Sequence, residues 1–280
     1  MKVGVIGIGL IGGSIVKDLR SQLEEDITIY GHDLSLDNIK KAKELNLIDE
    51  EKGLAELAEQ CDIIILSTPV NVAPTLLMQL LDYPKLIATI FDVGSIKAPI
   101  CKKVEQHPKR GHFVACHPIA GTEYSGPTSA IHDLFKHKIN IICEAEKSHE
   151  SSLKQVERLF QRLGSTNKYL TAEKHDEHIT YVSHLSHISS FGLANTVLDK
   201  KELNENIFNL AGSGFRSTVR LAKSSAAMWD PILIENNEKM LEAIDHYIDS
   251  LNKLKKLIQA QNHEGLIQQI EKANEVNKFL

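Results

Sequence analysis

Short apolar runs alternate with amphipathic segments through the first 168 residues of the chain. The runs are rich in Ile and Val and fall at residues 2–8, 27–33, 62–68, 85–93, 112–117 and 138–144. Between them, segments such as 34–45 and 70–81 have the spacing and length of helices. A further helix is expected over 150–163, before a last short strand near Tyr169. This alternation is typical of βαβ units, which build a mostly parallel sheet covered by helices on both faces.

The pattern changes after about residue 170, where no further strand is expected. The stretch 171–199 begins with Thr171 as a candidate N-cap and with acidic residues in its first turns, which favour a helix N-terminus. The segments 214–228, 231–261 and 264–277 are also helical in period and composition. The sequence therefore predicts an α/β domain over residues 1–168 and an all-α domain over residues 169–280.

Composition and charge limit the partners of the chain. It is 42% hydrophobic and 25% charged, with a net charge of −5, which gives no electrostatic footprint for nucleic acid or an anionic membrane. No segment reaches the roughly 20 uninterrupted apolar residues of a membrane span. Glycines interrupt the first apolar run and Asp18 follows it, so we do not expect a signal peptide. The four cysteines lack CxxC spacing, which favours reduced thiols in a cytoplasmic protein.

A glycine-rich motif follows the first predicted strand. It comprises Gly7, Ile8, Gly9, Leu10, Ile11 and Gly12, and a helical segment comes next. In this context GxGxxG is the fingerprint of a Rossmann-type dinucleotide-binding domain. Gly7 permits the tight turn, Gly9 lets the backbone approach a pyrophosphate, and Gly12 allows close packing of helix on strand. Leu10 and Ile11 begin the helix, whose unpaired N–H groups attract phosphate.

An acid ends the second predicted strand. Asp33 lies 21 residues after Gly12 (33 − 12), an interval at which an acid hydrogen-bonds a ribose 2′-hydroxyl and repels the 2′-phosphate of NADP. The alternative interpretation makes Asp33 the N-cap of the next helix. NAD is therefore favoured over NADP, although His32 and Lys40 nearby could weaken that preference.

Other polar residues are expected at the same edge of the sheet. Ser67, Thr68 and Pro69 follow the third strand, and Ser95 follows the next one in the segment DVGSIK. Ligands bind at the carboxyl edge of open α/β sheets. Ser95 is interpreted either as a helix N-cap or as a hydroxyl that faces the nicotinamide, and the sequence favours neither.

One of the 13 histidines stands out. His117 ends an apolar strand, at the edge that carries the glycine motif, and its reference pKa of about 6.5 suits it to accept a proton near neutral pH. His184 and His187 are three residues apart, a spacing compatible with metal ligation. No acid or Cys accompanies them at a recognisable ligand spacing, so no metal is predicted.

The motifs together resemble those of the prephenate dehydrogenases and the related arogenate dehydrogenases. Besides GxGxxG they are DVGSIK, HPIAGTEYSG, VSHLSH and GFRSTVRLA followed by MW, in order over essentially the whole chain. The resemblance implies a homodimer in which the all-α domain provides dimerisation. It also implies oxidative decarboxylation of prephenate with NAD(P) to 4-hydroxyphenylpyruvate, in tyrosine biosynthesis. Tyrosine is a candidate inhibitor and would act at the substrate site.

The resemblance assigns roles to the residues near the predicted site. His117 resembles the histidine that accepts the proton of the ring hydroxyl as hydride leaves the ring, and Ser95 matches the serine that supports it. Thr122 and Glu123 would line the substrate pocket.

The helical domain is implied to bind the substrate as well. His187, Arg216 and Arg220 match substrate-binding positions, and Arg220 would pair with a substrate carboxylate, to which a guanidinium is suited. Trp229 matches a tryptophan that reaches toward the partner's site in dimers of this family.

Two departures and three alternatives accompany this interpretation. Ser217 follows Arg216 where the family often has an acid, and Val219 replaces a commoner Thr, so any network that uses the acid is in doubt. The alternatives are an arogenate dehydrogenase, a β-hydroxyacid-type dehydrogenase, and a non-enzymatic NAD-sensing module. A β-hydroxyacid dehydrogenase would need a catalytic lysine where this chain has His184 and His187.

Overall fold

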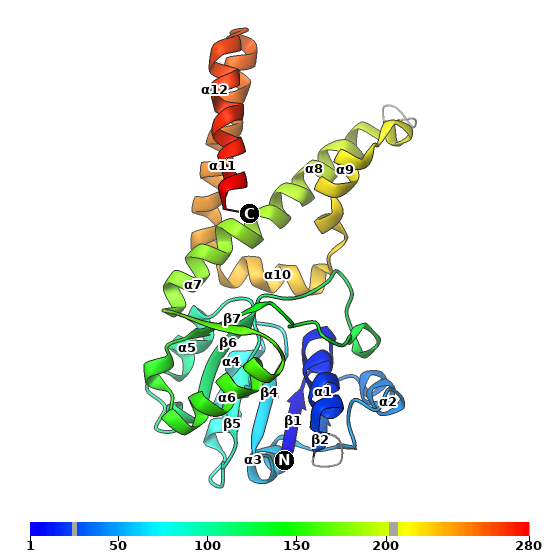
Figure 1. The fold of residues 1–280 in the computed structure, drawn as a ribbon, viewed down its shortest axis with the longest axis vertical. Coiled ribbons are helices and arrows are strands. Elements are labelled where there is room, and N and C mark those ends of the chain that lie inside the picture. The colour runs from blue at the N-terminus through cyan, green and yellow to red at the C-terminus, as the bar shows by residue number, and fades with distance from the viewer. Residues whose placement is uncertain (24–26, 202–206, 280) are drawn as a thin grey trace. The chain divides into compact units, whose positions relative to one another are not determined.

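The computed structural model describes residues 1–23, 27–201 and 207–279 (Figure 1). The chain forms two compact units, Met1–Asn236 and Asn237–Leu280. The change from strands to helices predicted at residues 168/169 falls inside the first unit, within its last strand, which runs from Thr166 to Leu170.

An eight-stranded sheet forms the centre of the first unit, with the strand order β3-β2-β1-β4-β5-β6-β7-β8. The strands are β1 Lys2–Ile6, β2 Thr28–His32, β3 Glu50–Glu51, β4 Ile63–Leu66, β5 Thr89–Asp92, β6 Phe113–Pro118, β7 Ile139–Cys143 and β8 Thr166–Leu170. Neighbouring strands run parallel except for the antiparallel pair β6 and β7. The prediction of a mostly parallel sheet is thus confirmed.

Helices cover both faces of this sheet. One face packs against α1 Leu10–Leu23, α2 Leu36–Glu44 and α6 Glu150–Arg162, and the other packs against α3 Leu54–Gln60, α4 Ala73–Asp82 and α5 Ala98–Val104. Successive side chains of a strand point to opposite faces, so Ile63 and Ile65 join the first core while Ile64 and Leu66 join the second. Both faces are buried, which is why the strands read as continuous apolar runs.

The parallel pairing brings the predicted polar segments to one edge of the sheet. The strands β1, β4, β5 and β6 are neighbours and parallel, so their carboxyl ends lie side by side. The glycine motif follows β1, Ser67 follows β4, Ser95 follows β5, and His117 is the next-to-last residue of β6. The common edge expected from the sequence is therefore present.

The rest of the first unit is helical, as predicted. The helix expected over 171–199 is confirmed, since α7 Ala172–Ile179, a π-helical turn Thr180–His184 and α8 Leu185–Lys201 follow one another without a break and Thr171 is the N-cap. After it come α9 Ser213–Thr218, a 3₁₀ turn Arg220–Lys223 and α10 Ala226–Glu235. The prediction of one helix over 214–228 is wrong, because α9 ends before Val219 and the extended residue Ser225 begins α10. The break predicted before residue 231 is wrong too, since Pro231 lies inside α10.

An apolar cluster packs this helical part onto the carboxyl edge of the sheet. Trp229 and Ile232 of α10 contact Val70 and Ile96, which follow β4 and β5, and Phe191 of α8 packs beside them. These side chains hold α8 and α10 next to the segments that carry the predicted site.

The second unit is a pair of helices. It consists of α11 Asn237–Gln259 and α12 His263–Asn274, joined by a tight turn and followed by a 3₁₀ turn Glu275–Lys278. The Asn262 side chain caps α12 by accepting the Gly265 N–H. Among the residues that the structure describes, no helix is long and apolar enough to cross a bilayer.

Candidate active site

The glycine motif forms a tight turn between β1 and α1. Gly7 has φ +85°, and a Cβ atom there would lie 2.4 Å from the backbone oxygen of Ser67, so only glycine fits. A Cβ on Gly12 would lie 2.6 Å from the Gly7 oxygen, whereas one on Gly9 would meet no atom of the described chain within 4 Å. The turn is closed on its inner side and open at Gly9, which is the arrangement a dinucleotide pyrophosphate requires.

Asp33 follows β2 and reaches back to this turn. Its Oδ2 accepts the Ile8 N–H (3.0 Å), and its Oδ1 accepts the Ser35 N–H (2.9 Å) and the side-chain amide of Asn38 (3.2 Å). Ser35, not Asp33, is the N-cap of α2. A carboxylate has about four acceptor positions, so one remains for a ribose hydroxyl.

Ser67 and Thr68 face the turn from β4. The Ser67 hydroxyl accepts the Gly12 N–H (3.1 Å), which joins the third glycine to the neighbouring strand. The Thr68 hydroxyl oxygen is buried and has no hydrogen-bond partner among the described residues. A buried hydroxyl without a partner is costly, and a bound polar ligand would satisfy it. Pro69 is exposed, and its carbonyl begins α4 by accepting from Val72 and Ala73.

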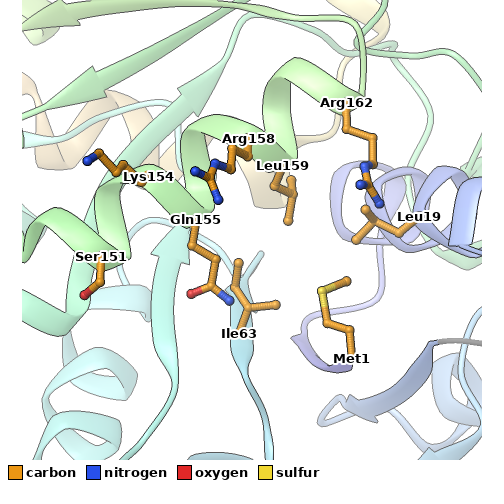
Figure 2. Close-up of a pocket in the computed structure, with 9 residues that line it drawn as sticks. All are labelled: Met1, Leu19, Ile63, Ser151, Lys154, Gln155, Arg158, Leu159 and Arg162. Atoms are coloured by element: carbon orange, nitrogen blue, oxygen red, sulfur yellow. The ribbon is translucent and has the colours of Figure 1, made fainter.

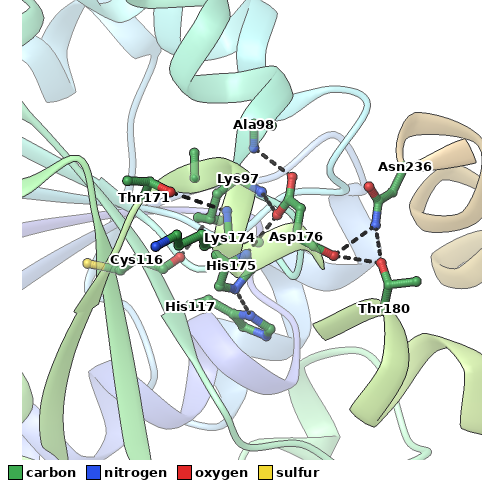
Figure 3. A network of polar contacts seen from close by, with 12 residues as sticks. Lys97, Ala98, Cys116, His117, Thr171, Lys174, His175, Asp176, Thr180 and Asn236 are labelled. Atoms are coloured by element: carbon green, nitrogen blue, oxygen red, sulfur yellow. Dashed lines mark hydrogen bonds and ion pairs between the residues drawn. The ribbon is translucent and has the colours of Figure 1, made fainter. Parts of the chain in front are cut away.

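Three polar side chains form a chain that begins at His117 (Figure 3). The His117 Nδ1 lies 2.8 Å from the Nε2 of His175, and the His175 Nδ1 lies 2.7 Å from the Oδ1 of Asp176. His117 is partly exposed at the end of β6, while His175 and Asp176 on α7 are 1% and 0% exposed. This series of hydrogen bonds therefore runs from the sheet edge into the interior of the first unit.

Backbone groups hold Asp176 in place. Its Oδ1 accepts the Lys97 N–H (2.7 Å) and its Oδ2 accepts the Ala98 N–H (2.8 Å) at the start of α5. The side chain of Asn236 donates to the Thr180 hydroxyl (2.7 Å), which in turn donates to the Asp176 carbonyl (2.6 Å). Figure 3 shows how these contacts tie α5, α7 and the end of α10 together.

A buried ion pair lies under the same edge. The Lys97 ammonium is fully buried, pairs with Asp92 at the end of β5, and donates to the Cys116 carbonyl (2.7 Å). Asp92 also accepts the backbone N–H groups of Gly94 (3.0 Å) and Cys116 (3.2 Å). A buried pair is tolerable only with such additional hydrogen bonds, and here they fix the end of β5 against β6.

The histidines of this region are kept neutral by their surroundings. Burial, the neighbouring His175 and the Lys97 charge hold the pKa of His117 well below its ordinary value. Burial also lowers the pKa of His175, although Asp176 partly opposes that effect. Burial lowers the pKa of His184 to about 4. A neutral imidazole can accept a proton, so His117 is in the state that a general base requires.

Ser95 lies in the segment after β5 and is partly exposed. It is not a helix N-cap, because α5 begins at Ala98 with Lys97 as its cap residue. Within the described ranges no hydrogen bond joins Ser95 to His117, whose partner is His175 instead. The role of Ser95 as a support for His117 stays a prediction.

Aromatic and imidazole rings gather where the helices meet the sheet. The rings of His187 and Trp229 stack at 3.6 Å, and His184 meets the Trp229 ring edge-on at 5.6 Å. Trp229 is 6% exposed, and its indole N–H and both ring nitrogens of His184 lack partners among the described residues. The π-helical turn ends at His184, and such turns are frequent at functional sites.

The remaining predicted substrate residues lie at the surface. Arg220 is exposed, and its charge adds to burial, the main cause, in lowering the pKa of the partly buried His187. Arg216 is exposed and donates to the Ala211 carbonyl (3.3 Å). Thr122 is exposed and accepts the Tyr124 N–H (3.3 Å), while Glu123 is partly exposed. None of these four contacts His117 among the described hydrogen bonds and ion pairs.

Sequence reasoning missed four buried residues of this site: Asp92, Lys97, His175 and Asp176. A signal was present in α7, where Ala172, His175, Asp176 and Ile179 recur at i, i+3, i+4 and i+7. That spacing puts the histidine and the acid on the buried face of a helix, where polar groups need partners.

A separate hollow of about 420 Å³ lies at the opposite edge of the sheet (Figure 2). It is lined by Met1, Leu19, Ile63, Ser151, Lys154, Gln155, Arg158, Leu159 and Arg162. Met1 directly precedes β1 and Ile63 begins β4, so both lie at the amino ends of these strands, away from the glycine motif. It is therefore not the predicted site.

Comparison with protein families gives two matches. Residues 15–168 match the family "Prephenate dehydrogenase, nucleotide-binding domain", and residues 171–272 match "Prephenate dehydrogenase, dimerization domain".

Individual proteins give the same picture. The chain is 33% identical to the crystal structure of prephenate dehydrogenase from A. aeolicus in complex with hydroxyphenyl propionate and NAD⁺, covering 99% of this chain and 97% of that one with a TM-score of 0.89. The structure of Synechocystis arogenate dehydrogenase is 28% identical over the full length of both chains, with a TM-score of 0.80. A prephenate dehydrogenase of Bacillus subtilis is 29% identical over 96% of this chain and 73% of its own length.

Proposed function

The chain belongs to the prephenate dehydrogenase family of NAD-dependent oxidoreductases, and from this we propose that it converts prephenate to 4-hydroxyphenylpyruvate by oxidative decarboxylation. NAD is the proposed cofactor, and His117 is the proposed base for the proton of the ring hydroxyl. The observation that carries the proposal is the position of His117. It is a neutral, partly exposed imidazole at the same sheet edge as the glycine turn.

The residues of the glycine turn suit the cofactor. We assign the pyrophosphate to the open backbone at Gly9 and to the first N–H groups of α1 at Leu10 and Ile11. Asp33 has one acceptor position left for the ribose, which favours NAD because a 2′-phosphate would meet its charge. The Thr68 hydroxyl supports the assignment, since it lacks a partner among the described residues.

His117 performs the proton step in this proposal. When bound, NAD supplies the acceptor for the hydride that leaves the substrate ring. The hydroxyl O–H bond breaks and an N–H bond forms on His117, with Ser95 beside the nicotinamide end of the site. Aromatisation of the ring makes the loss of carbon dioxide strongly favourable, so the protein need only remove the proton and hold the anionic groups.

We assign the substrate's negative charges to the helical side of the site. Arg220 is the proposed partner of a carboxylate, with His187, Arg216 and Trp229 around it. The indole N–H of Trp229 supports this assignment, because it has no acceptor within the described part of the chain and an anion would provide one. We assign Thr122 and Glu123, on the loop after β6, to the wall of the substrate pocket that faces these helical residues.

The enzyme is proposed to act as a homodimer. The residues matching a dimerization-domain family support this, as does the apolar surface of α11, where Leu241, Ile248, Leu251 and Ile258 are 47–63% exposed. Exposed apolar stripes of this kind mark interaction surfaces. We retain residues 1–168 and 169–280 as the proposed domains. We also infer a cytoplasmic location, since the four cysteines are unpaired.

Replacing the base tests this function. His117→Asn should lower kcat with prephenate by about 10²- to 10⁴-fold, because that range is typical for the loss of a general base. The dissociation constant of NAD, measured by fluorescence titration, should stay within about twofold of the wild-type value, since the cofactor is held by other residues. An unaltered kcat would remove His117 as the base.

A further inference from the structure

The chain of contacts from His117 into the interior ends in a group that can only accept. Both oxygens of Asp176 receive backbone N–H groups, from Lys97 at 2.7 Å and Ala98 at 2.8 Å. A backbone N–H cannot act as an acceptor, so its orientation toward the carboxylate fixes the direction of the bond. A carboxylate has no proton to donate, so Asp176 also accepts from the ring of His175.

The direction of that bond determines the tautomer of His175. Its Nδ1 must carry the proton in order to donate to Asp176 at 2.7 Å. His175 is buried and its pKa is lowered, so the ring is neutral and carries one proton only. Its Nε2 is then a bare acceptor, directed at the Nδ1 of His117 at 2.8 Å (Figure 3).

The same reasoning carries the constraint to His117. Its Nδ1 must hold the proton in order to donate to His175, so in the neutral ring the Nε2 has a free lone pair. We propose that His175 and Asp176 are positioning residues, which lock His117 in the Nδ1–H tautomer and so make its Nε2 the atom that accepts the substrate proton. The tautomer itself does not depend on the proposed function; only the expected effect on kcat rests on it.

The proton balance of the step is simple. The substrate O–H bond breaks, a bond forms between that proton and the His117 Nε2, and His117 becomes an imidazolium. Its Nδ1–H then makes a charge-assisted hydrogen bond to the neutral His175. The charged or titratable groups that face His117 are Lys97 after β5, His175 on α7 and His184 on the π-helical turn, and each disfavours a lasting positive charge there. The imidazolium is therefore short-lived.

The tautomer is measurable without substrate. Nitrogen NMR of the ¹⁵N-histidine-labelled full-length protein distinguishes protonated from bare ring nitrogens, and His117→Asn identifies the signals of residue 117. We expect the wild-type signals to show Nδ1 protonated and Nε2 bare at neutral pH. A wild-type His117 with its proton on Nε2 would overturn the proposal, whatever the enzyme's substrate proves to be.

Variants at residue 175 give the kinetic test. His175→Phe keeps a ring but removes the acceptor for the His117 Nδ1–H, so His117 should no longer be held in one tautomer. We expect kcat to fall by at least about 10-fold, with an unchanged KM for NAD. His175→Gln should restore part of kcat, because its amide oxygen can accept from Nδ1. His178→Phe is the matched control, since His178 is exposed on the same helix. If His175→Phe and His178→Phe have equal kcat values and the same His117 tautomer, the proposal is wrong.

The two proposals fail in different ways. Absence of turnover with prephenate, together with an Nδ1–H tautomer that His175→Phe abolishes, would remove the proposed function and leave the positioning role. Turnover that requires His117, together with an Nε2–H tautomer in the wild type, would support the proposed function and remove the positioning role.

Discussion

At the scale of single residues, the sequence indicates the position of His117 but not its hydrogen-bond partner. The sequence indicated His117 correctly as a strand-end residue at the sheet edge, since the strand pattern alone places it there. It did not indicate His175, because a pattern of apolar and polar positions does not say which buried polar groups meet. That pairing depends on α7 packing against β6 and α5, which are far away in the sequence.

Arg220 offers a direct test of substrate binding. Arg220→Ala should raise the KM for prephenate by about 10- to 100-fold with a smaller change in kcat, because a hydrogen-bonded charge contributes about 1.5–3 kcal/mol. Steady-state kinetics measure both constants. Lys223→Ala, on the same exposed 3₁₀ turn, is the control and should leave KM unchanged. An unchanged KM in Arg220→Ala would place that arginine outside the pocket.

The buried His184 makes stability depend on pH. Its pKa is about 4 in the folded protein and about 6.5 in the unfolded chain, so the unfolded state binds more protons below pH 6.5. Stability is therefore lost as the pH falls from 6.5 toward 4, with about 2 kcal/mol lost between pH 7 and pH 5 from this group.

Replacement of this histidine isolates the effect. Urea unfolding of the wild type and His184→Phe at pH 7 and pH 5 gives the difference, in which the other titrating groups cancel. The variant should lose about 2 kcal/mol less on acidification than the wild type. His178→Phe should behave like the wild type, because His178 is exposed. Equal losses in all three proteins would contradict the account of His184.

At the scale of elements, the strand–turn–helix at the N-terminus was predicted in detail because its constraints are local. The glycine spacing, the strand before it and the helix after it all lie within residues 2–23. The helix over 171–199 was predicted equally well. The later helices were predicted less well, since α9 ends before Val219 and α10 begins after Ser225, where Trp229 packs in a cluster with the distant Ile96.

Gly7 and Gly9 should differ in how their replacement affects stability and NAD binding. Gly7→Ala forces a side chain at φ +85° against the Ser67 backbone, so it should lower the free energy of unfolding by more than about 1 kcal/mol and prevent NAD binding. The Cβ atom of Gly9→Ala meets no atom of the described residues within 4 Å, so the stability of this variant should match the wild type while the dissociation constant of NAD rises at least about 10-fold.

Urea unfolding and NAD titration of these two variants separate the two roles. A destabilised Gly9→Ala, or a Gly9→Ala that binds NAD normally, would contradict the assignment of Gly9 to the pyrophosphate. A fully stable Gly7→Ala would contradict the close approach of the turn to β4.

At the scale of the whole molecule, the order of strands and helices was predictable because both faces of the sheet are buried and parallel strands require helical crossovers. The antiparallel placement of β7 was not predicted, since an apolar run has no direction in its pattern. The family resemblance, carried by motifs spread over the chain, is confirmed by matches over residues 15–168 and 171–272.

Dimerisation should depend on the apolar stripe of α11. Leu251 is 48% exposed in the single chain, and Leu251→Glu places a charge at this position. If a second copy covers this surface, the charge would be buried there at a high cost, so the variant should be a monomer. Light scattering after size-exclusion chromatography gives the mass. Lys253→Glu, about half a turn away on the same helix, should remain a dimer. A dimeric Leu251→Glu would show that this stripe is not the interface.

The central claim is that the chain oxidises prephenate with NAD. Formation of NADH or NADPH should be followed by absorbance with prephenate and arogenate separately, each with NAD and NADP, for the wild type and for His117→Asn. The account predicts the highest kcat/KM for prephenate with NAD, and a loss of about 10²-fold or more in the variant. Absence of turnover with both substrates, or equal rates in the wild type and His117→Asn, would contradict it.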